Sequence, residues 1–371
     1  MIILDYNAIT PIFPEILDEV NHLLKNNFFL NPSSVHTEGK NAKKILEKAK
    51  TEILQNFNAK CHEIYFTSGG TESNNMALNF KVFDCIFTLE TEHDSILNPV
   101  SKLKHKFIKL DENGLVDLRD LATQIKALNS SNFLCSFLLA NNETGVVQNI
   151  NDIAKIVHEN GGILHSDVSQ FIGKEKFDFT NFHLDVITFS GNKIHAGFGG
   201  GVIIFTSGME IKPLILGGGQ QNYKRGGTEN LPQIYALSKA ILKVNSEEYL
   251  TNYFQKTHAF QQKIETEISK IGGEIFGKNV KRISNTSSIF MPNVNNFIQA
   301  MEFDLNGICI SIGSACSSGR TTVSHVLKAC GILEEKAKNY IRISASPLNN
   351  LEEIEKFLSI WKKLFYKGNF R

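Results

Sequence analysis

The feature that most limits how this chain can fold is a regular alternation of short β-rich runs with amphipathic helical patterns between about residues 62 and 206. Such alternation favours a largely parallel sheet covered by helices on both faces. Helical periodicity is clearest over residues 71–80, 118–128 and 150–159. Seven strands are predicted, over residues 63–67, 85–89, 106–110, 133–139, 162–165, 186–189 and 202–205. The sequence therefore predicts an α/β fold with a mainly parallel, seven-stranded sheet.

A second region follows the glycine-rich stretch 216–228, which cannot lie inside a regular element without a large conformational penalty. Further helical and strand patterns fill this region. They cover residues 231–244, 250–271, 287–291, 307–310, 340–344 and 351–364. We therefore predict a large domain of residues 15–245, and a smaller α+β domain formed by residues 1–14 and 246–371.

The composition excludes several classes of function. Lys and Arg number 39 and Asp and Glu 38, so the net charge is +1 and no global field attracts nucleic acid or an anionic membrane. No apolar run approaches the roughly 20 residues that cross a bilayer. The N-terminus lacks a secretory pattern, which predicts a cytoplasmic protein. The 6 cysteines show neither Cys-x-x-Cys pairs nor a zinc spacing, so no metal site is predicted. Because the net charge is only +1, a small molecule is the expected partner.

Two residues at predicted strand ends, Lys193 and Asp167, indicate the chemistry. Lys193 closes the segment Ser-Gly-Asn-Lys (190–193) after an apolar run, and Asp167 ends an earlier strand candidate, with Gln170 three residues later. Pyridoxal phosphate requires a lysine that forms a Schiff base and a carboxylate that keeps the ring nitrogen protonated. A lone lysine is usually a solvated surface charge. The pair, however, suggests pyridoxal phosphate as the cofactor.

A glycine-containing turn over residues 68–74 follows a predicted strand and opens a predicted helix. Backbone N–H groups and the positive end of the helix dipole converge at such a point, so a phosphate is expected there. Ser190 could add a further hydrogen bond. The alternative is an ordinary helix cap, in which Thr71 or Ser68 satisfies free backbone donors.

Two further motifs fall at the same edge of the predicted sheet. His93 begins a helix after the strand candidate 85–89, where an imidazole can lie over an aromatic ring and move a proton near neutral pH. The alternative is a surface histidine at a helix start. Residues 141–145 (Asn-Asn-Glu-Thr-Gly) place amide side chains at this edge, although Asn and Gly also favour simple turns.

Cys316 and Arg342 lie in the predicted smaller domain. Small residues surround Cys316 in Gly-Ser-Ala-Cys-Ser-Ser-Gly (313–319), which is the setting of a thiol that can reach a substrate. A loop also tolerates small residues without any function. Arg342 interrupts an apolar strand candidate, where a guanidinium suits a substrate carboxylate. A structural ion pair is the alternative.

Together these segments closely resemble, nearly end to end, the cysteine desulfurases of the class V aminotransferase superfamily, which have the fold-type I architecture of pyridoxal-phosphate enzymes. Ten ordered matches carry the resemblance. They are LDYNA (4–8), NPSSVH (31–36), TSGGTES (67–73), TEH (91–93), NNETG (141–145), DxxQ (167–170), SGxK (190–193), RGGT (225–228), GSAC (313–316) and IR (341–342).

The resemblance implies a role for each matching residue. Lys193 would hold the cofactor as a Schiff base, and Asp167 would pair with its pyridine nitrogen. Gln170 would reach the phenolic oxygen, and His93 would stack on the ring. The other implied contacts are Gly70, Thr71, Ser190, Asn192 and the neighbouring subunit's Thr228 for the phosphate, and Asn31, Asn142 and Arg342 for the carboxylate end of the substrate, with Asn142 also near the cofactor.

The implied activity is that of a homodimeric cysteine desulfurase. The Lys193 amine would remove the Cα proton of L-cysteine while the cofactor ring accepts the electrons. The Cys316 thiolate would then take the sulfur as a persulfide, leaving alanine, with His93 as a proton relay. A protein acceptor, such as an iron–sulfur scaffold or a transfer-RNA thiolation protein, would receive the sulfur. The alternatives are a selenocysteine lyase, another class V aminotransferase, or a scaffold that binds the cofactor without catalysis.

Three positions depart from the family pattern. The family usually has histidine where this chain has Asn192, alanine at Val168 and threonine at Ile9. Asn192 can still donate to a phosphate but lacks the possible charge of histidine, so weaker retention of the cofactor is expected. Val168 is predicted to press on the ring face opposite His93. The reacting groups remain.

Overall fold

The computed structural model describes residues 1–26, 30–313 and 323–369. Its largest sheet has seven strands in the order β2-β8-β7-β6-β5-β3-β4, which confirms the predicted sheet. Every neighbouring pair is parallel except the two pairs that involve β8. The strands are β2 (His62–Thr67), β3 (Cys85–Thr88), β4 (His105–Phe107), β5 (Phe133–Ser136), β6 (Ile163–Asp167), β7 (Val186–Ser190) and β8 (Gly201–Thr206).

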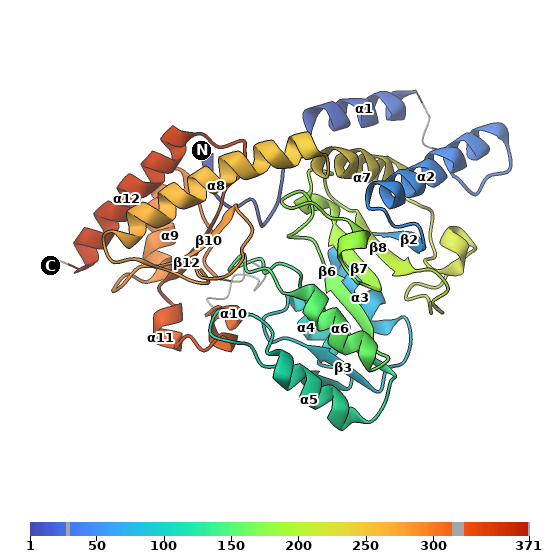
Figure 1. The fold of residues 1–371 in the computed structure, drawn as a ribbon. Helices are drawn as coiled ribbons and strands as arrows, with labels where there is room; N and C mark the ends of the chain where they lie inside the picture. Colours follow the sequence, from blue (N-terminus) through green and yellow to red (C-terminus); the bar gives the residue numbers. More distant parts are fainter. Residues whose placement is uncertain (27–29, 314–322, 370–371) are drawn as a thin grey trace.

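Helices cover both faces of this sheet (Figure 1). Side chains alternate along a strand, so Ile203 joins one hydrophobic cluster and the adjacent Val202 joins another. The cluster of Ile203 is completed by α3 (Gly70–Asn79) and α4 (Asp94–Val100). The cluster of Val202 is completed by α1 (Pro14–Lys25), α2 (Thr37–Asn56), α5 (Leu118–Leu128), α6 (Ile150–Glu159) and α7 (Leu231–Val244).

The remaining elements form a smaller body with its own core. The long helix α8 (Glu247–Ser269) leads into it from the end of α7 (Figure 1). Leu4, near the N-terminus, packs in the same core as Phe303 and Trp361, so the first strand and the last helix belong to one body. The elements are β1 (Ile2–Ile3), β9 (Glu274–Ile275), β10 (Thr286–Phe290), α9 (Asn296–Leu305), β11 (Ile308–Cys309), α10 (His325–Ala329), α11 (Glu334–Ala337), β12 (Tyr340–Ser344) and α12 (Leu351–Asn369).

Two small sheets organise this body. Strand β10 pairs antiparallel with both β12 and β9, and β1 pairs in parallel with β11. An isolated bridge joins Asp5 to Ser344, which places the segment after β1 beside the end of β12. The N-terminal segment is therefore built into the smaller body before it runs toward the large sheet.

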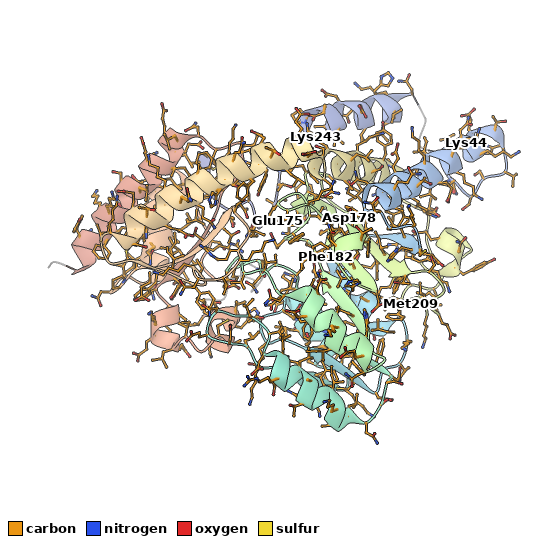
Figure 2. All side chains as sticks on the ribbon, viewed as in Figure 1. Lys44, Glu175, Asp178, Phe182, Met209 and Lys243 are labelled. Atoms are coloured by element: carbon orange, nitrogen blue, oxygen red, sulfur yellow. The ribbon has the colours of Figure 1, made fainter. Side chains whose placement is uncertain are left out.

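The outer surfaces of the helices are largely polar, as the exposed Lys44 on α2 illustrates (Figure 2). Phe182 instead packs on the large core and stacks on Phe177, with ring centroids 5.3 Å apart. Among the described residues, no helix has the length and apolar character needed to span a membrane.

An ion pair anchors α6 to the residue that precedes β7. His158 Nε2 lies 2.8 Å from Asp185 Oδ2, and that oxygen also accepts a hydrogen bond of 2.8 Å from the Leu164 N–H. The hydrogen bond to Asp185 raises the pKa of His158. A group whose pKa rises on folding stabilises the protein below its unfolded pKa, and loses that contribution as the pH rises through its folded pKa.

We therefore expect His158→Ala to lower the free energy of unfolding more at pH 5.5 than at pH 8.5. The difference should stay below about 1 kcal/mol because the pair is partly exposed to solvent. Urea unfolding at the two pH values measures it. In the Asp185→Asn background the difference should disappear, and an equal loss at both pH values would contradict the pairing.

Candidate active site

A cavity of about 340 Å³ lies between the large sheet and the smaller body, at the carboxyl ends of the central strands. Ligands of open parallel sheets bind at this edge because the loops that follow successive strands meet there. The residues from the sequence prediction that line it are Gly70, Thr71, His93, Asn142, Asp167, Gln170, Ser190, Asn192, Lys193 and Arg342. The fold thus brings together residues that lie up to 272 positions apart in the chain, from 70 to 342.

Lys193 enters the cavity from a short 3₁₀ helix, η2 (Gly191–Lys193), that follows β7 directly. Gly191 is needed for this close passage, because an added Cβ would lie 2.8 Å from Leu237 Cδ2 and 3.2 Å from the Gly200 carbonyl oxygen. The Lys193 ammonium donates a hydrogen bond to the Ala8 carbonyl. The amine is therefore held where the N-terminal segment crosses the sheet edge.

Asp167 is the last residue of β6, and both of its carboxylate oxygens accept hydrogen bonds. Asn74 Nδ2 donates to Oδ2 at 2.8 Å, and the Ser169 N–H donates to Oδ1 at 2.9 Å. The same Asn74 amide donates to Ser95 Oγ at 2.8 Å and accepts from Thr188. This buried network fixes the orientation of a carboxylate that lines the cavity.

His93 caps the N-terminus of α4, as the sequence predicts. Its Nδ1 accepts a hydrogen bond of 3.1 Å from the Ser95 N–H and lies 2.8 Å from Ser95 Oγ. Because Nδ1 is bound in this way, the ring orientation is fixed against the cavity wall. The neutral tautomer that fits these contacts carries its proton on Nε2.

The turn before α3 forms a cradle that suits an anion. The cap position of α3 is Gly69, which has no side chain to cap the helix, and Ser68 Oγ donates to Glu72 Oε2 at 2.5 Å. A Cβ added at Gly70 would lie 3.2 Å from Ser190 Cβ and 3.9 Å from Ser169 Oγ. Uncapped N–H groups and two hydroxyls thus surround a space that only glycine leaves open, which suits a phosphate.

The positions that depart from the family pattern are now placed. Asn192 lines the cavity and accepts a hydrogen bond of 2.7 Å from Ser190 Oγ, so its amide N–H₂ is the group it can offer to an anion. Val168 is wholly buried in the hydrophobic core, whereas Ser169 lines the cavity. The predicted contact of Val168 with the cofactor ring was therefore wrong, because alternate side chains after Asp167 face opposite sides. Ile9 is partly exposed.

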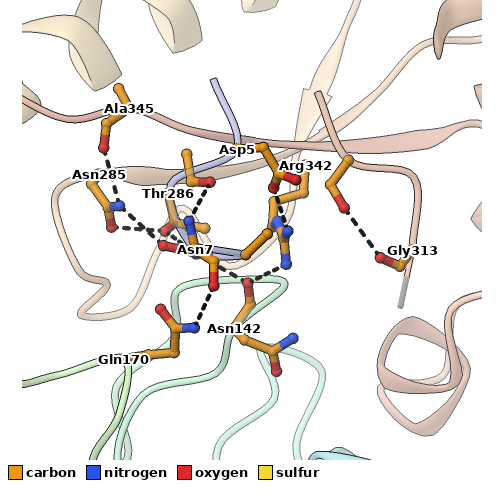
Figure 3. A network of polar contacts seen from close by, with 12 residues as sticks. Asp5, Asn7, Asn142, Gln170, Asn285, Thr286, Gly313, Arg342 and Ala345 are labelled. Atoms are coloured by element: carbon orange, nitrogen blue, oxygen red, sulfur yellow. Dashed lines mark hydrogen bonds and ion pairs between the residues drawn. The ribbon is translucent and has the colours of Figure 1, made fainter. Parts of the chain in front are cut away.

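Arg342 reaches the cavity from the centre of β12. Its Nη2 pairs with Asp5 Oδ1 at 2.6 Å, and Nη1 donates to the Asn142 carbonyl at 3.0 Å (Figure 3). The buried Nε has no hydrogen-bond partner within the described part of the chain. The structural ion pair expected as the alternative is therefore present, and Nε is a buried donor left unpaired among the described residues.

Two predicted site residues lie outside the cavity, and a third is not described. Asn31 is exposed on the turn before α2, where its side chain accepts from the Ser33 N–H at 2.9 Å, so this chain alone does not bring it to the cavity. Thr228 is also exposed and outside the cavity. Cys316 lies outside the described residues.

The sequence prediction missed several residues of the cavity and its surroundings. Asn7 lines the cavity and bonds to both bodies of the protein, and Lys174 lies buried behind it. Asn74 holds Asp167, and His325 lines the opposite wall. Asn7 lies within the motif LDYNA and Asn74 directly follows TSGGTES, but only the fold gives these polar residues a common location.

The fold and the cavity together define a pyridoxal-phosphate enzyme, and the family comparison agrees. The sequence model that defines the class-V aminotransferase family matches residues 2–357, so the chain belongs to this pyridoxal-phosphate-dependent family. Cysteine desulfurase IscS of Dictyoglomus turgidum is 33% identical over 380 residues, which cover 98% of this chain and 94% of the relative.

Solved structures show the same likeness. A NifS-like protein from Rickettsia africae is 35% identical, with a TM-score of 0.91 and 99% of each chain covered. A structure described as SspA in complex with cysteine is 28% identical, with a TM-score of 0.79, and covers 94% of this chain and 100% of that one.

The residues present fit pyridoxal phosphate at both ends of the molecule. The open cradle at Gly70 suits its phosphate, and the hydrogen-bonded Asp167 suits its protonated ring nitrogen. The Lys193 amine lies on the same cavity, as a Schiff base with the cofactor requires.

We expect Gly70→Ala to weaken binding of pyridoxal phosphate by about tenfold or more, because the new methyl group would occupy the space of one charge-assisted hydrogen bond. Titration of the apo protein with the cofactor, followed by absorbance, measures this effect. The fold should be unaffected, since alanine suits the first turn of a helix. Asn79→Ala, at the far end of α3, is the matched control, and equal affinities for the two variants would contradict the cradle.

Proposed function

We propose that this protein is a cysteine desulfurase, which removes sulfur from L-cysteine to give L-alanine and a persulfide on Cys316. The observation that carries the proposal is a cavity that holds the Lys193 amine, the Asp167 carboxylate fixed by hydrogen bonds, and the Arg342 guanidinium. The Nε of that guanidinium has no partner among the residues that the structure describes. Relatives named cysteine desulfurase extend over nearly the whole chain and support it.

The residues assigned to the cofactor site hold and orient the cofactor and the substrate. When bound, pyridoxal phosphate supplies an electron sink for the bond that breaks at the substrate Cα. Lys193 Nζ binds the cofactor and then moves the Cα proton, while the Asp167 carboxylate keeps the ring nitrogen protonated. His93 presents Nε2 as the nitrogen that can exchange a proton with the substrate.

The substrate carboxylate binds at Arg342. The guanidinium already holds Asp5 and the Asn142 carbonyl, which fix its plane, and Nε remains to donate to an anion. The Asn142 side chain lies on the same cavity and can add a polar contact. Because a bound guanidinium loses little freedom when the substrate arrives, it orients the amino acid at a small entropic penalty.

Sulfur transfer is assigned to Cys316. Its thiolate attacks the substrate sulfur, so an S–S bond forms as the C–S bond breaks, and one cysteine gives one alanine and one persulfide. The described residues on both sides of its segment support this role. Ser311 bridges Arg342 through backbone hydrogen bonds, and Ser324 Oγ donates to Glu143 Oε2 at 2.6 Å beside the cavity.

The finer assignments extend this proposal. The protein acts as a homodimer in which Thr228 completes the phosphate site of the neighbouring subunit. The location of Thr228 supports this, since it is exposed and lies outside the cavity of its own chain. The sulfur then passes to a protein acceptor of an iron–sulfur or thiolation pathway. Residues 15–245 form the large domain, and residues 1–14 and 246–371 the small one, which the two hydrophobic clusters support.

We expect Cys316→Ala to abolish the formation of alanine from cysteine, because no thiolate remains to accept the sulfur. The visible absorption of bound pyridoxal phosphate should be unchanged, since Lys193 is intact. Alanine is quantified after incubation of the purified protein with cysteine. Cys61→Ala removes an exposed cysteine far from the described cavity and is the matched control.

Unchanged turnover by Cys316→Ala would exclude the desulfurase mechanism and favour another class V activity. Lys193→Ala provides an independent check, because it should remove the visible absorption as well as the activity. A Lys193→Ala variant that still showed the covalent cofactor band would exclude the proposed cofactor site.

A further inference from the structure

Lys174 is a second lysine beside the cavity, four residues after Gln170, and unlike Lys193 it is buried. Its side-chain nitrogen donates to Gln170 Oε1 and, at 2.8 Å, to Asn7 Oδ1. Only 5% of the residue is exposed, and within the described ranges no carboxylate pairs with it. Burial, together with the charges of Lys193 and Arg342, holds the pKa of Lys174 well below its ordinary value.

A lysine in such a position is costly to the fold, because a buried ammonium is normally paired with a carboxylate. Neutral amide oxygens compensate only part of the lost hydration. An apolar side chain of the same length would fill the space without that penalty. The arrangement therefore points to a role in the site and not to a contribution to stability.

The hydrogen bonds fix the orientation of the Gln170 amide. Lys174 Nζ donates to Oε1, so Oε1 faces Lys174. The Asn7 backbone carbonyl can only accept, so Nε2 must face Asn7, at 3.0 Å. Gln170 also lines the cavity, and the second hydrogen on Nε2 is the donor that it can offer there.

We propose that Lys174 is a positioning residue that keeps the Gln170 amide turned with its N–H toward the cavity, where it donates to the phenolic oxygen of the bound cofactor. The inference rests on the proposed function, since the acceptor belongs to pyridoxal phosphate. Without Lys174 the Gln170 amide keeps only its bond to the Asn7 carbonyl, so its orientation is held less firmly. The N–H that faces the cavity then donates less well to the phenolic oxygen.

Lys174 also donates to Asn7, and the experiment must distinguish this contact from the one with Gln170. Asn7 Oδ1, which accepts from Lys174, also accepts from Asn285 Nδ2 at 3.0 Å, and Asn7 Nδ2 donates to Thr286 Oγ1 at 2.8 Å (Figure 3). Loss of Lys174 could therefore act through Asn7 and the smaller body. Only an effect carried by Gln170 disappears when Gln170 is itself removed.

A double-mutant cycle on the full-length protein makes this separation. The dissociation constant of pyridoxal phosphate is measured for the wild type, Lys174→Met, Gln170→Ala and the double variant. We expect each single variant to bind about tenfold more weakly, which corresponds to about 1.4 kcal/mol. The double variant should bind no more weakly than Gln170→Ala alone.

The absorption maximum of the bound cofactor is the second readout. Lys174→Met should shift it in the same direction as Gln170→Ala, because both variants remove the same donor from the phenolic oxygen. Lys176→Met is the matched control. Lys176 lies on the same loop, and its side-chain nitrogen donates to the Asn245 carbonyl at 2.6 Å, away from the cavity. It should alter neither the affinity nor the spectrum.

Additive losses in the cycle, or an unchanged affinity and spectrum for Lys174→Met, would overturn the inference. If Lys174→Met does not fold, Lys174→Gln replaces it in the cycle, because it keeps an amide donor for Gln170 Oε1. We expect that variant to bind the cofactor within about threefold of the wild type, and a tenfold loss would again overturn the inference. A wild-type protein that binds no cofactor would instead contradict the proposed function.

Discussion

Hydrogen bonds from the side chain and backbone of Asn7 connect the two walls of the cavity, and the shape of the cavity depends on them. Its amide donates to the Asn142 carbonyl and to Thr286, its oxygen accepts from Lys174 and Asn285, and its backbone N–H donates to Ser344 Oγ at 3.0 Å. Partners from both bodies of the protein thus meet on one buried residue. Because buried amides are costly when unpaired, these bonds fix the two walls of the cavity relative to each other.

The charges around the cavity explain what it can bind. Lys193 and Arg342 supply positive groups at the cavity, and Lys174 lies buried behind it. The carboxylates that line the cavity are Asp94, Glu143 and Asp167, and Asp5 pairs with Arg342. Burial raises the pKa of Glu92 well above its ordinary value, which favours its neutral form. The positive groups suit the phosphate and the phenolate of the cofactor and the carboxylate of the substrate.

Much of the fold and part of the site could be predicted because the signals are local. Apolar periodicity gave α5, α6, α7 and β12 with the observed bounds, and His93 is the predicted helix cap. Alternation after Asp167 is enough to place the Val168 side chain in the core, whereas the family pattern predicts it at the cofactor ring. Asn31 lies outside the cavity of this chain, because motif order says nothing about which surface a turn will face.

The sequence by itself determined the chemical groups and their order, because a strand that ends in Asp167 or leads into Lys193 carries its reactive residue to one sheet edge whatever the loops do. Only the tertiary structure decided which polar groups share the cavity. Arg342 pairs with Asp5, which lies 337 residues away in the sequence. Lys174 orients Gln170 through a hydrogen bond that no sequence motif predicts. Such contacts depend on the packing of whole domains, which fixes distances that no local pattern encodes.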